Sequence, residues 1–309
     1  MKKIYRSISA NYFYAKVQHS LVRCDISFTI LRRMMKRDFL DVHGGKLYYE
    51  VLGTGHSLVL LHAGIANLRM WDEQVTAFSK HYQVICYDAR TYGESTSEAV
   101  EFSNCQDLLG LLNHLNIDKA HVLGISRGGS IAMDFTLEFP EKVSSLVMIA
   151  SNPSGFDYTD DSELEKTYFV RDEELSETKN AEAMAELDVE MWVDGPGQKP
   201  GRAHKSVREK VRAMTLERYQ TYFAAFPEHE PTPIPLKPPA TERLASITVP
   251  TLVITGSLDF SYTHAAAKAM TRDIPNAKHV SISDVAHMVN MEKPEAFNKV
   301  VLEFLNQLS

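Results

Sequence analysis

Cysteine is scarce in this sequence of 309 residues. The three cysteines, Cys24, Cys86 and Cys105, are odd in number and show no CxxC spacing. A disulfide framework or a thiolate metal site would need more cysteines at closer spacing, so neither is expected. This cysteine usage fits a reducing compartment, and the sequence predicts a cytoplasmic protein without a metal centre.

Long apolar runs and a basic excess are missing as well. No apolar stretch approaches the ~18 residues that a membrane-spanning helix requires, so no membrane partner is expected. The formal net charge of −7 offers no basic surface for a nucleic acid. With 44% hydrophobic residues, the chain can bury one large core, or a core and a small second unit.

The first 37 residues differ from the rest in charge. They hold nine Lys or Arg residues against a single acid, Asp25. The longest apolar stretch nearby, Ile26 to Leu31, is short and interrupted, and no small-residue cleavage site follows it, so a secretory signal is not indicated. An amphipathic surface anchor is one interpretation. We favour a poorly ordered extension, or translation begun upstream of a native start at Met34 or Met35.

From Asp38 onward, short apolar and β-branched runs alternate with helical patterns. This alternation is typical of α/β proteins, in which helices cover a mostly parallel, twisted sheet on both faces. Several runs are almost entirely apolar, as expected of strands buried on both faces. Helical patterns lie at about 71–80, 103–115, 128–139, 264–272 and 294–307. The predicted strands are Lys46–Val51, Ser57–His62, Gln83–Asp88, Ala120–Gly124, Ser144–Ser151, Thr251–Thr255 and His279–Ser283.

The alternation stops between residues 152 and 248. An acidic helical pattern at about 160–190 precedes a basic one at about 202–218, and five prolines follow from Pro231 to Pro239. Because proline is excluded from helix interiors and central strands, this cluster predicts an extended connector. We therefore predict a basic extension at 1–37, an α/β core at 38–151 and 249–309, and an inserted helical cap at 152–248.

The sequence Gly124-Ile125-Ser126-Arg127-Gly128 lies between a predicted strand and a predicted helix. A serine on such a tight turn takes a strained backbone conformation, and bulky side chains two residues away would collide there. Glycine at both positions removes the collision. The helix that follows directs free N–H groups and its positive dipole end at a reacting carbonyl group. Ser126 is therefore the predicted nucleophile.

A serine hydroxyl needs a base that removes its proton. His287 follows the last predicted strand, and the carboxyl ends of parallel strands are where such folds place their sites. His264 and His279 lie on a helix surface and at a strand start, where a solvated side chain is the simpler interpretation. His287 is therefore the predicted base.

The imidazole in turn needs a carboxylate that fixes its tautomer and stabilises its charged form. Asp259 follows the predicted strand Thr251–Thr255, again at a carboxyl end. Asp284, close to His287 in sequence, and Asp88, at the end of an earlier strand, are rivals. The chain order of nucleophile, acid and histidine favours Asp259, because this is the order in hydrolases with such a serine turn.

The oxyanion formed by the attack needs two N–H donors, each worth about 3 kcal/mol of barrier. The amide of Arg127, directly after the nucleophile, is the first predicted donor. The second is expected from the loop after Ser57–His62, where Gly64 is the favoured candidate and Ile65 the alternative. His62 is predicted to be structural, with its hydrogen bonds made within that loop.

Five motifs occur together and resemble, in their order, those of the α/β-hydrolase superfamily. The resemblance covers about residues 38–309, is weakest in the predicted cap, and points to the branch of 3-oxoadipate enol-lactonases, small carboxylesterases and carbon–carbon bond hydrolases. Two departures are mild: Ala63 replaces a commoner glycine, and Thr91 replaces the usual glycine after the arginine. The motifs are Leu60-Leu61-His62-Ala63-Gly64, Tyr87-Asp88-Ala89-Arg90-Thr91-Tyr92-Gly93-Glu94-Ser95, the serine turn Gly124-Ile125-Ser126-Arg127-Gly128, Val249-Pro250-Thr251-Leu252 and the histidine loop Asp284-Val285-Ala286-His287.

Arg127 is an unusual neighbour for a nucleophile, because the proteins that this sequence resembles often carry Met or Leu there. Its guanidinium could hold a substrate carboxylate in a bidentate pair, and would be the only strong cationic group beside Ser126. The simpler alternative is a side chain turned away toward a backbone or acidic group. The thirteen acids against three bases in residues 157–190 favour the alternative, because such a surface does not attract anions.

Aromatic residues of the predicted cap are candidates for an apolar substrate pocket with few polar groups. Ordinary core packing is the commoner reason for aromatic residues at helical spacing. The candidates are Trp192, Tyr219, Tyr222 and Phe223.

The sequence thus predicts a serine hydrolase that cleaves a small ester or lactone through an acyl-enzyme, without a metal or an organic cofactor. Its expected partner is the small-molecule substrate. The same fold leaves open a carbon–carbon bond hydrolase, a cofactor-free perhydrolase or haloperoxidase, an acyltransferase, and a ligand receptor that keeps the triad. An epoxide hydrolase or dehalogenase is disfavoured because the turn carries serine instead of aspartate.

Overall fold

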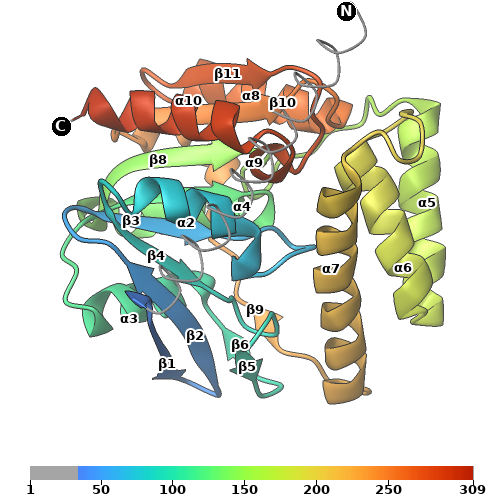
Figure 1. The fold of residues 1–309 in the computed structure, drawn as a ribbon, viewed down its shortest axis with the longest axis horizontal. Coiled ribbons are helices and arrows are strands. Elements are labelled where there is room, and N and C mark those ends of the chain that lie inside the picture. The colour runs from blue at the N-terminus through green and yellow to red at the C-terminus, as the bar shows by residue number, and fades with distance from the viewer. Residues whose placement is uncertain (1–33, 309) are drawn as a thin grey trace, which may run out of the picture. The chain divides into compact units, whose positions relative to one another are not determined.

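The computed structural model describes residues 34–308. The predictions for residues 1–33, which include most of the basic extension and Cys24, lie outside the described residues. Within these, one sheet has the strand order β1-β2-β4-β3-β7-β8-β10-β11, and β5 pairs with β2 beside this path (Figure 1). The strands are β1 (Lys36–Val42), β2 (Gly45–Leu52), β3 (Ser57–Leu61), β4 (Gln83–Tyr87), β5 (Thr96–Ser97), β7 (Ala120–Ile125), β8 (Val143–Ile149), β10 (Thr251–Gly256) and β11 (Lys278–Ile282).

The central pairings of this sheet are parallel. β3 pairs in parallel with β4 and β7, and β8 with β7 and β10, while β2 pairs antiparallel with β4. β3, β7 and β10 are buried along their whole length, as near-continuous apolar runs predict for strands covered on both faces. In register, Leu61 of β3 is opposite Gly124 of β7, so the loop after β3 begins beside the serine turn.

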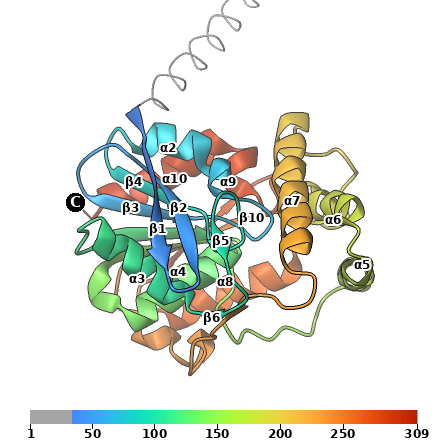
Figure 2. The same ribbon diagram turned by 90° about the horizontal axis from the view of Figure 1, so that it is seen from below.

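Helices cover both faces of the sheet. Figure 2 shows α2 and α10 on one face and α3, α4 and α8 on the other. The short helix α9 (Val289–Glu292) precedes α10, and 3₁₀ turns lie at Leu68–Trp71, Pro140–Lys142, Ala240–Glu242 and Leu244–Ser246. The covering helices are α2 (Asp72–Phe78), α3 (Asn104–His114), α4 (Arg127–Glu138), α8 (Ser261–Asp273) and α10 (Pro294–Asn306).

The predicted α/β class is confirmed, and each of the seven predicted strands is present within two residues of its expected ends. The sequence patterns did not indicate β1, whose residues are mostly exposed and which carries four charged side chains in seven positions. Such an edge strand lacks the apolar run that identifies a buried one. The sequence patterns also did not indicate the two-residue strands β5, β6 (Glu101–Phe102) and β9 (Thr232–Pro233).

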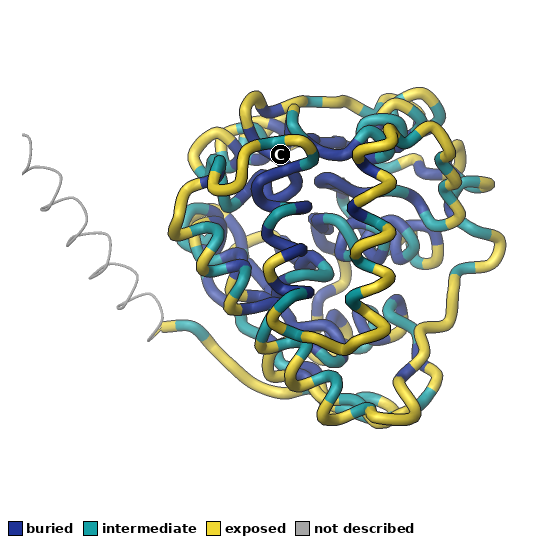
Figure 3. Tube along the Cα trace, turned by 90° about the vertical axis from the view of Figure 1, so that its right-hand side faces the viewer, coloured by how far each residue is buried: buried dark blue, intermediate teal, exposed yellow. Residues whose placement is uncertain are grey.

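Between β8 and β10 the chain forms a helical segment. It consists of α5 (Glu163–Thr178), α6 (Ala181–Asp188), the π-helical η3 (Val189–Asp194) and α7 (Lys205–Ala225). In Figure 1 these helices lie beyond the carboxyl end of β8, and Figure 3 shows buried residues behind their more exposed outer traces. Residues 37–308 belong to one compact unit, so the division into core and cap stays a prediction.

The proline-rich stretch contains β9, which pairs in parallel with β6, and the described residues 227–239 contain no α-helix. No helix of residues 34–308 has the length and apolar character needed to cross a bilayer. Cys86 and Cys105 are free, buried thiols. The cytoplasmic location stays a prediction.

Candidate active site

Ser126 lies on the turn between β7 and α4. Its backbone has φ 53° and ψ −123°, a conformation that a residue with a side chain rarely adopts. The Ser126 N–H donates to the Ile149 carbonyl (2.8 Å), and the Ser151 hydroxyl donates to the Ser126 carbonyl (2.7 Å). These two hydrogen bonds, to the end of β8 and to the residue two positions beyond it, hold the strained turn in place.

The two glycines of the turn are required by close backbone approach. A Cβ added to Gly124 would lie 2.2 Å from the Gly128 carbonyl oxygen, and one added to Gly128 would lie 2.3 Å from that of Leu61. Both contacts are far inside van der Waals distance and involve backbone atoms that cannot move aside. The turn therefore packs directly against the end of β3.

His287 and Asp259 contact each other at the carboxyl ends of two neighbouring strands, β10 and β11. His287 Nδ1 lies 2.9 and 3.0 Å from the two Asp259 carboxylate oxygens. Both side chains are buried, with exposed fractions of 2% and 0%. A carboxylate at this position fixes the proton on Nδ1. His287 Nε2 then carries the lone pair, and it is buried without a hydrogen-bond partner among the described residues.

The rival carboxylate Asp284 lies apart from this pair. Its side chain is 84% exposed and its nearest cation is Lys293, at 3.6 Å. Its backbone is in the left-handed region, with φ 54°. Asp284 therefore belongs to a turn at the surface, although it is only three residues from His287 in sequence.

Asp88, the second rival for the role of the acid, connects two loops through hydrogen bonds. Its carboxylate accepts hydrogen bonds from the N–H groups of Leu68 (2.8 Å) and Glu94 (3.0 Å). Burial raises the pKa of Asp88 to about 7, against the opposing effect of these two donors. Its partners lie in the loops after β3 and β4, so its contacts stabilise the walls of the site.

His62 joins the same two loops. Its Nδ1 lies 2.8 Å from the Ala63 carbonyl oxygen, and its Nε2 accepts the Ala89 N–H at 3.0 Å. Burial, the largest cause, and the charges of Arg127 and Arg218 lower its pKa to about 3, so the imidazole is neutral. One bond stays inside the loop, as expected, and the other reaches the loop after β4.

The residues that carry the candidate oxyanion donors lie close together. A Cβ added to Gly64 would lie 3.7 Å from Arg127 Cβ, so the loop after β3 runs beside the first residue of α4. As the first helical residue, Arg127 has an N–H without an acceptor inside the helix. Ile65 is the next residue along the same loop, and both Gly64 and Ile65 are half-buried.

A model of the family described as the alpha/beta hydrolase fold matches residues 56–294. The chain belongs to this family. The resemblance inferred from the sequence motifs is therefore confirmed, and so is the predicted fold.

Named relatives of this α/β hydrolase carry hydrolase activities. A 3-oxoadipate enol-lactonase of Acinetobacter baylyi is 27% identical, with 91% of this chain and 98% of the relative covered. A 2-hydroxy-6-oxononadienedioate/2-hydroxy-6-oxononatrienedioate hydrolase of Burkholderia vietnamiensis is 28% identical, with 85% and 91% covered. A thermophilic esterase of Thermogutta terrifontis has a TM-score of 0.69 and 25% identity, with 88% and 99% covered. The chain is thus a hydrolase.

Of the four predicted aromatic pocket residues, Trp192 lies against the histidine of this hydrolase. Its ring centroid is 4.7 Å from that of His287 and 4.8 Å from that of Phe260. Trp192 belongs to η3, a π-helical segment, and such segments frequently occur at functional sites. This π-helical turn, which is wider than an α-helical one, begins directly after α6.

The other three candidates come from α7. Tyr219 donates to the buried carboxylate of Asp188 (2.8 Å) and stacks on Phe223 at 5.8 Å. Tyr222 hydrogen-bonds Glu230 and lines a cavity between α7 and the loop after β4. The structure therefore brings Trp192 to the histidine and places Tyr219 and Phe223 in packing within the helical segment.

The side chain of Arg127 is not turned toward an acid. One guanidinium nitrogen lies 3.3 Å from the Asn104 side-chain oxygen, and its central carbon lies 5.0 Å from the Tyr92 ring centroid. Arg218 of α7 approaches the same ring at 4.4 Å. The prediction that Arg127 is the only strong cationic group here was therefore wrong. The basic pattern of α7 did not show that Arg218 faces inward, although Met214 and Tyr222, four residues away on either side, indicated that face.

Thr91 shows the cost of one departure from the family pattern. Its φ is 69°, in the left-handed region where the usual glycine is free of strain and a β-branched residue is not. This conformation costs about 1–2 kcal/mol. Thr91 also lines the cavity beside α7, so the strained residue presents its side chain there.

Arg202 ties the histidine loop to the helical segment. It donates to the Asp194 carbonyl (2.6 Å) and forms an ion pair with Glu292 (2.5 Å). Glu292 in turn accepts the N–H of Ala286 (2.7 Å), the residue before His287. Sequence patterns gave no signal for this connection, because its partners are ninety residues apart.

Proposed function

We propose that this hydrolase cleaves a small carboxylic ester or lactone, with Ser126 as nucleophile, His287 as general base and Asp259 as the acid that orients it. Ser126 Oγ attacks the carbonyl carbon while His287 Nε2 takes the hydroxyl proton. Nε2 then returns that proton to the leaving oxygen. Water repeats the sequence on the acyl-enzyme and releases the acid. In a lactone the leaving oxygen stays attached to the product.

The observation that carries the proposal is the state of the two nitrogens of His287. Nδ1 is held by both oxygens of a buried carboxylate, while Nε2 is buried without a hydrogen-bond partner among residues 34–308. A structural histidine normally uses both nitrogens, as His62 does here. A buried Nε2 that no other group occupies supports the role of a base, and the Ser126 hydroxyl, which is not hydrogen-bonded to it, must come within hydrogen-bond distance when the substrate binds.

The oxyanion is proposed to bind two N–H groups, from Arg127 and from Gly64, with Ile65 as the alternative to Gly64. The N-terminus of α4 adds its dipole to the Arg127 donor. Hydrogen bonds and the close packing of its glycines hold the serine turn rigid. Backbone donors on such a turn need no reorganisation as charge develops on the oxyanion. Trp192 supplies an apolar wall beside His287 that helps exclude water.

Two kinds of named relatives guide the choice of substrate. An enol-lactonase and a carbon–carbon bond hydrolase match with 27% and 28% identity. An ester or lactone is the simpler substrate, because the proposed triad can form the acyl-enzyme from it directly. Carbon–carbon bond cleavage would first need an isomerisation of the substrate. Carbon–carbon bond cleavage therefore serves as the contrasting outcome of the test.

A substrate panel on the purified protein tests this proposal. It contains aryl esters, five-membered enol lactones and 2-hydroxy-6-oxo-dienoic acids, each followed at saturating and subsaturating concentration. We expect turnover of esters and lactones, and a loss of about 10³- to 10⁶-fold in Ser126→Ala. Ser130→Ala, whose hydroxyl donates to the Asn152 carbonyl, is the matched control. Turnover of the dienoic acids alone would replace the proposal by carbon–carbon bond hydrolysis.

A further inference from the structure

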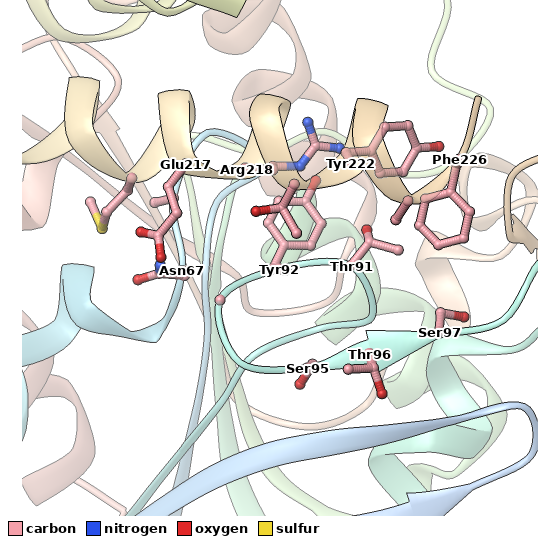
Figure 4. Close-up of a pocket in the computed structure, with 15 residues that line it drawn as sticks. Asn67, Thr91, Tyr92, Ser95, Thr96, Ser97, Glu217, Arg218, Tyr222 and Phe226 are labelled. Atoms are coloured by element: carbon pink, nitrogen blue, oxygen red, sulfur yellow. The ribbon is translucent and has the colours of Figure 1, made fainter.

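Two arginines approach one tyrosine ring from different parts of the fold. Arg127 comes from the first turn of α4 and Arg218 from the middle of α7, and their guanidinium carbons lie 5.0 and 4.4 Å from the Tyr92 ring centroid. Figure 4 shows Arg218 and Tyr222 on α7 facing the loop that carries Tyr92. Such contacts are favourable, but two like charges at one ring repel each other.

Neither arginine forms an ion pair with a carboxylate of the described residues, although the charge of Arg218 acts on the buried carboxylate of Asp188. Arg127 Nη1 and Arg218 Nε are buried without a hydrogen-bond partner among residues 34–308. The other contacts of Arg218 are the rings of Tyr219 and Tyr222, at 5.5 and 5.3 Å. A buried guanidinium donor without an acceptor is costly, and two such donors in one place indicate an anion.

A cavity of about 200 Å³ adjoins Arg218. The one carboxylate that lines it, Glu217, already forms an ion pair with Arg69 on its outer side. Glu230, near Tyr222, accepts the hydroxyl of that tyrosine. Glu217 and Glu230 therefore have other partners. The cavity is lined by Thr91, Tyr92, Ser95, Arg218, Tyr222 and Phe226, among others.

This place is adjacent to the proposed reaction centre. Tyr92 Oη lies 3.8 Å from a Cβ added to Gly64, and Arg127 directly follows Ser126. An anionic group that contacts both arginines thus lies beside the proposed oxyanion donors. Ser126 and Arg127 do not line the cavity itself, so a substrate whose charge lies at the arginines must extend from the cavity toward Ser126.

We propose that Arg127 and Arg218 bind a carboxylate of the substrate beside Tyr92, so that the hydrolase selects esters or lactones of dicarboxylic acids. This inference rests on the proposed function and adds Arg218 as a residue that determines specificity. Each guanidinium offers a planar pair of donors that matches a carboxylate, and the anion removes the repulsion between the two cations. Arg218 lies on the helical segment, and Arg127 lies on α4, which covers the sheet. A carboxylate bound to both therefore connects the segment to the sheet.

The test compares two probe substrates that differ in charge and by one methyl group: the mono(4-nitrophenyl) ester of glutaric acid and the methyl ester of that compound. The measured quantity is the ratio of their kcat/KM values, anionic over neutral. Arg218→Met and Arg127→Met should each lower this ratio by about 10- to 100-fold, the size of a charge-assisted hydrogen bond. Because both side chains share one carboxylate, the double variant should lose less than the product of the two single losses.

Arg212→Met is the matched control on the same helix. Its guanidinium pairs with Glu182 and Glu186, away from the cavity, so the ratio should stay unchanged. An unchanged ratio in Arg218→Met would overturn the inference. If that variant does not fold, Arg127→Met decides, because the proposal requires both arginines. Failure of the proposed function has a different signature: Ser126→Ala would hydrolyse both probes as fast as the wild type.

Discussion

The helical segment between β8 and β10 buries apolar side chains, as the central strands do, but unlike those strands it also buries carboxylates. In β7, β8 and β10 nearly every residue is buried, and most are apolar. In α5, by contrast, the two buried residues are Glu165 and Tyr168, and Glu165 accepts the backbone N–H and the hydroxyl of Ser261. Asp188 and Asp194 are likewise buried in the segment and hydrogen-bonded.

This difference has a consequence for the site. The buried strands are closely packed, so they form a rigid frame that carries the serine turn, Asp259 and His287. Buried carboxylates need specific donors, so they fix how the helices meet the loops of that frame. We therefore expect the chemical step to depend on the sheet, and the placement of the segment's substrate-binding residues to depend on its buried carboxylates.

The largest expected effect concerns the acid on the sheet side. Asp259→Asn should keep the fold and lower kcat by up to about 10⁴-fold, because an amide favours the wrong tautomer of His287. Asp284→Asn is the matched control, since its side chain is exposed. Steady-state kinetics with an aryl ester and a thermal melt of each variant measure both effects. Equal losses in the two variants would remove Asp259 from the proposed triad.

The connection between the segment and the histidine loop should matter less. Arg202→Met leaves the 5%-exposed carboxylate of Glu292 without its cation, which should lower the free energy of unfolding by about 2–4 kcal/mol. Arg171→Met, which breaks an exposed pair with Glu190, should cost less than about 1 kcal/mol. Urea denaturation compares the two. If the two costs were similar, the ion pair of Arg202 would not be what joins the segment to the loop.

The smallest effect concerns pH. Burial raises the pKa of Asp188 to about 6 from an ordinary value of 3.8. A raised folded-state pKa contributes stability that is full below the unfolded pKa and is lost as pH rises through about 6. Wild type should therefore lose roughly 1–3 kcal/mol relative to Asp188→Asn between pH 4 and pH 7. Urea midpoints at four pH values measure it, and parallel curves for the two proteins would contradict it.

The same contrast explains what the sequence could predict. Strands such as Leu58–Leu61 can be predicted from the sequence, because burial on both faces leaves an unbroken apolar run. The proposed triad follows from local motifs, because each residue lies in the loop that follows a strand. Arg218 and Arg202 could not be found in this way, since their roles depend on partners far away in sequence. The exposed, charged β1 was missed for the related reason that an edge strand needs no apolar run.

The most direct measurement of the central proposal is the mass of the protein during turnover. An aryl ester with a slowly hydrolysed acyl group is mixed with the wild type, quenched in acid within milliseconds, digested and analysed by mass spectrometry. We predict one acyl group per chain, on the peptide that contains Ser126, together with a stoichiometric burst of the aryl alcohol. Neither signal should occur in Ser126→Ala. A burst of equal size in that variant, or an acyl group on another residue, would contradict the proposed nucleophile.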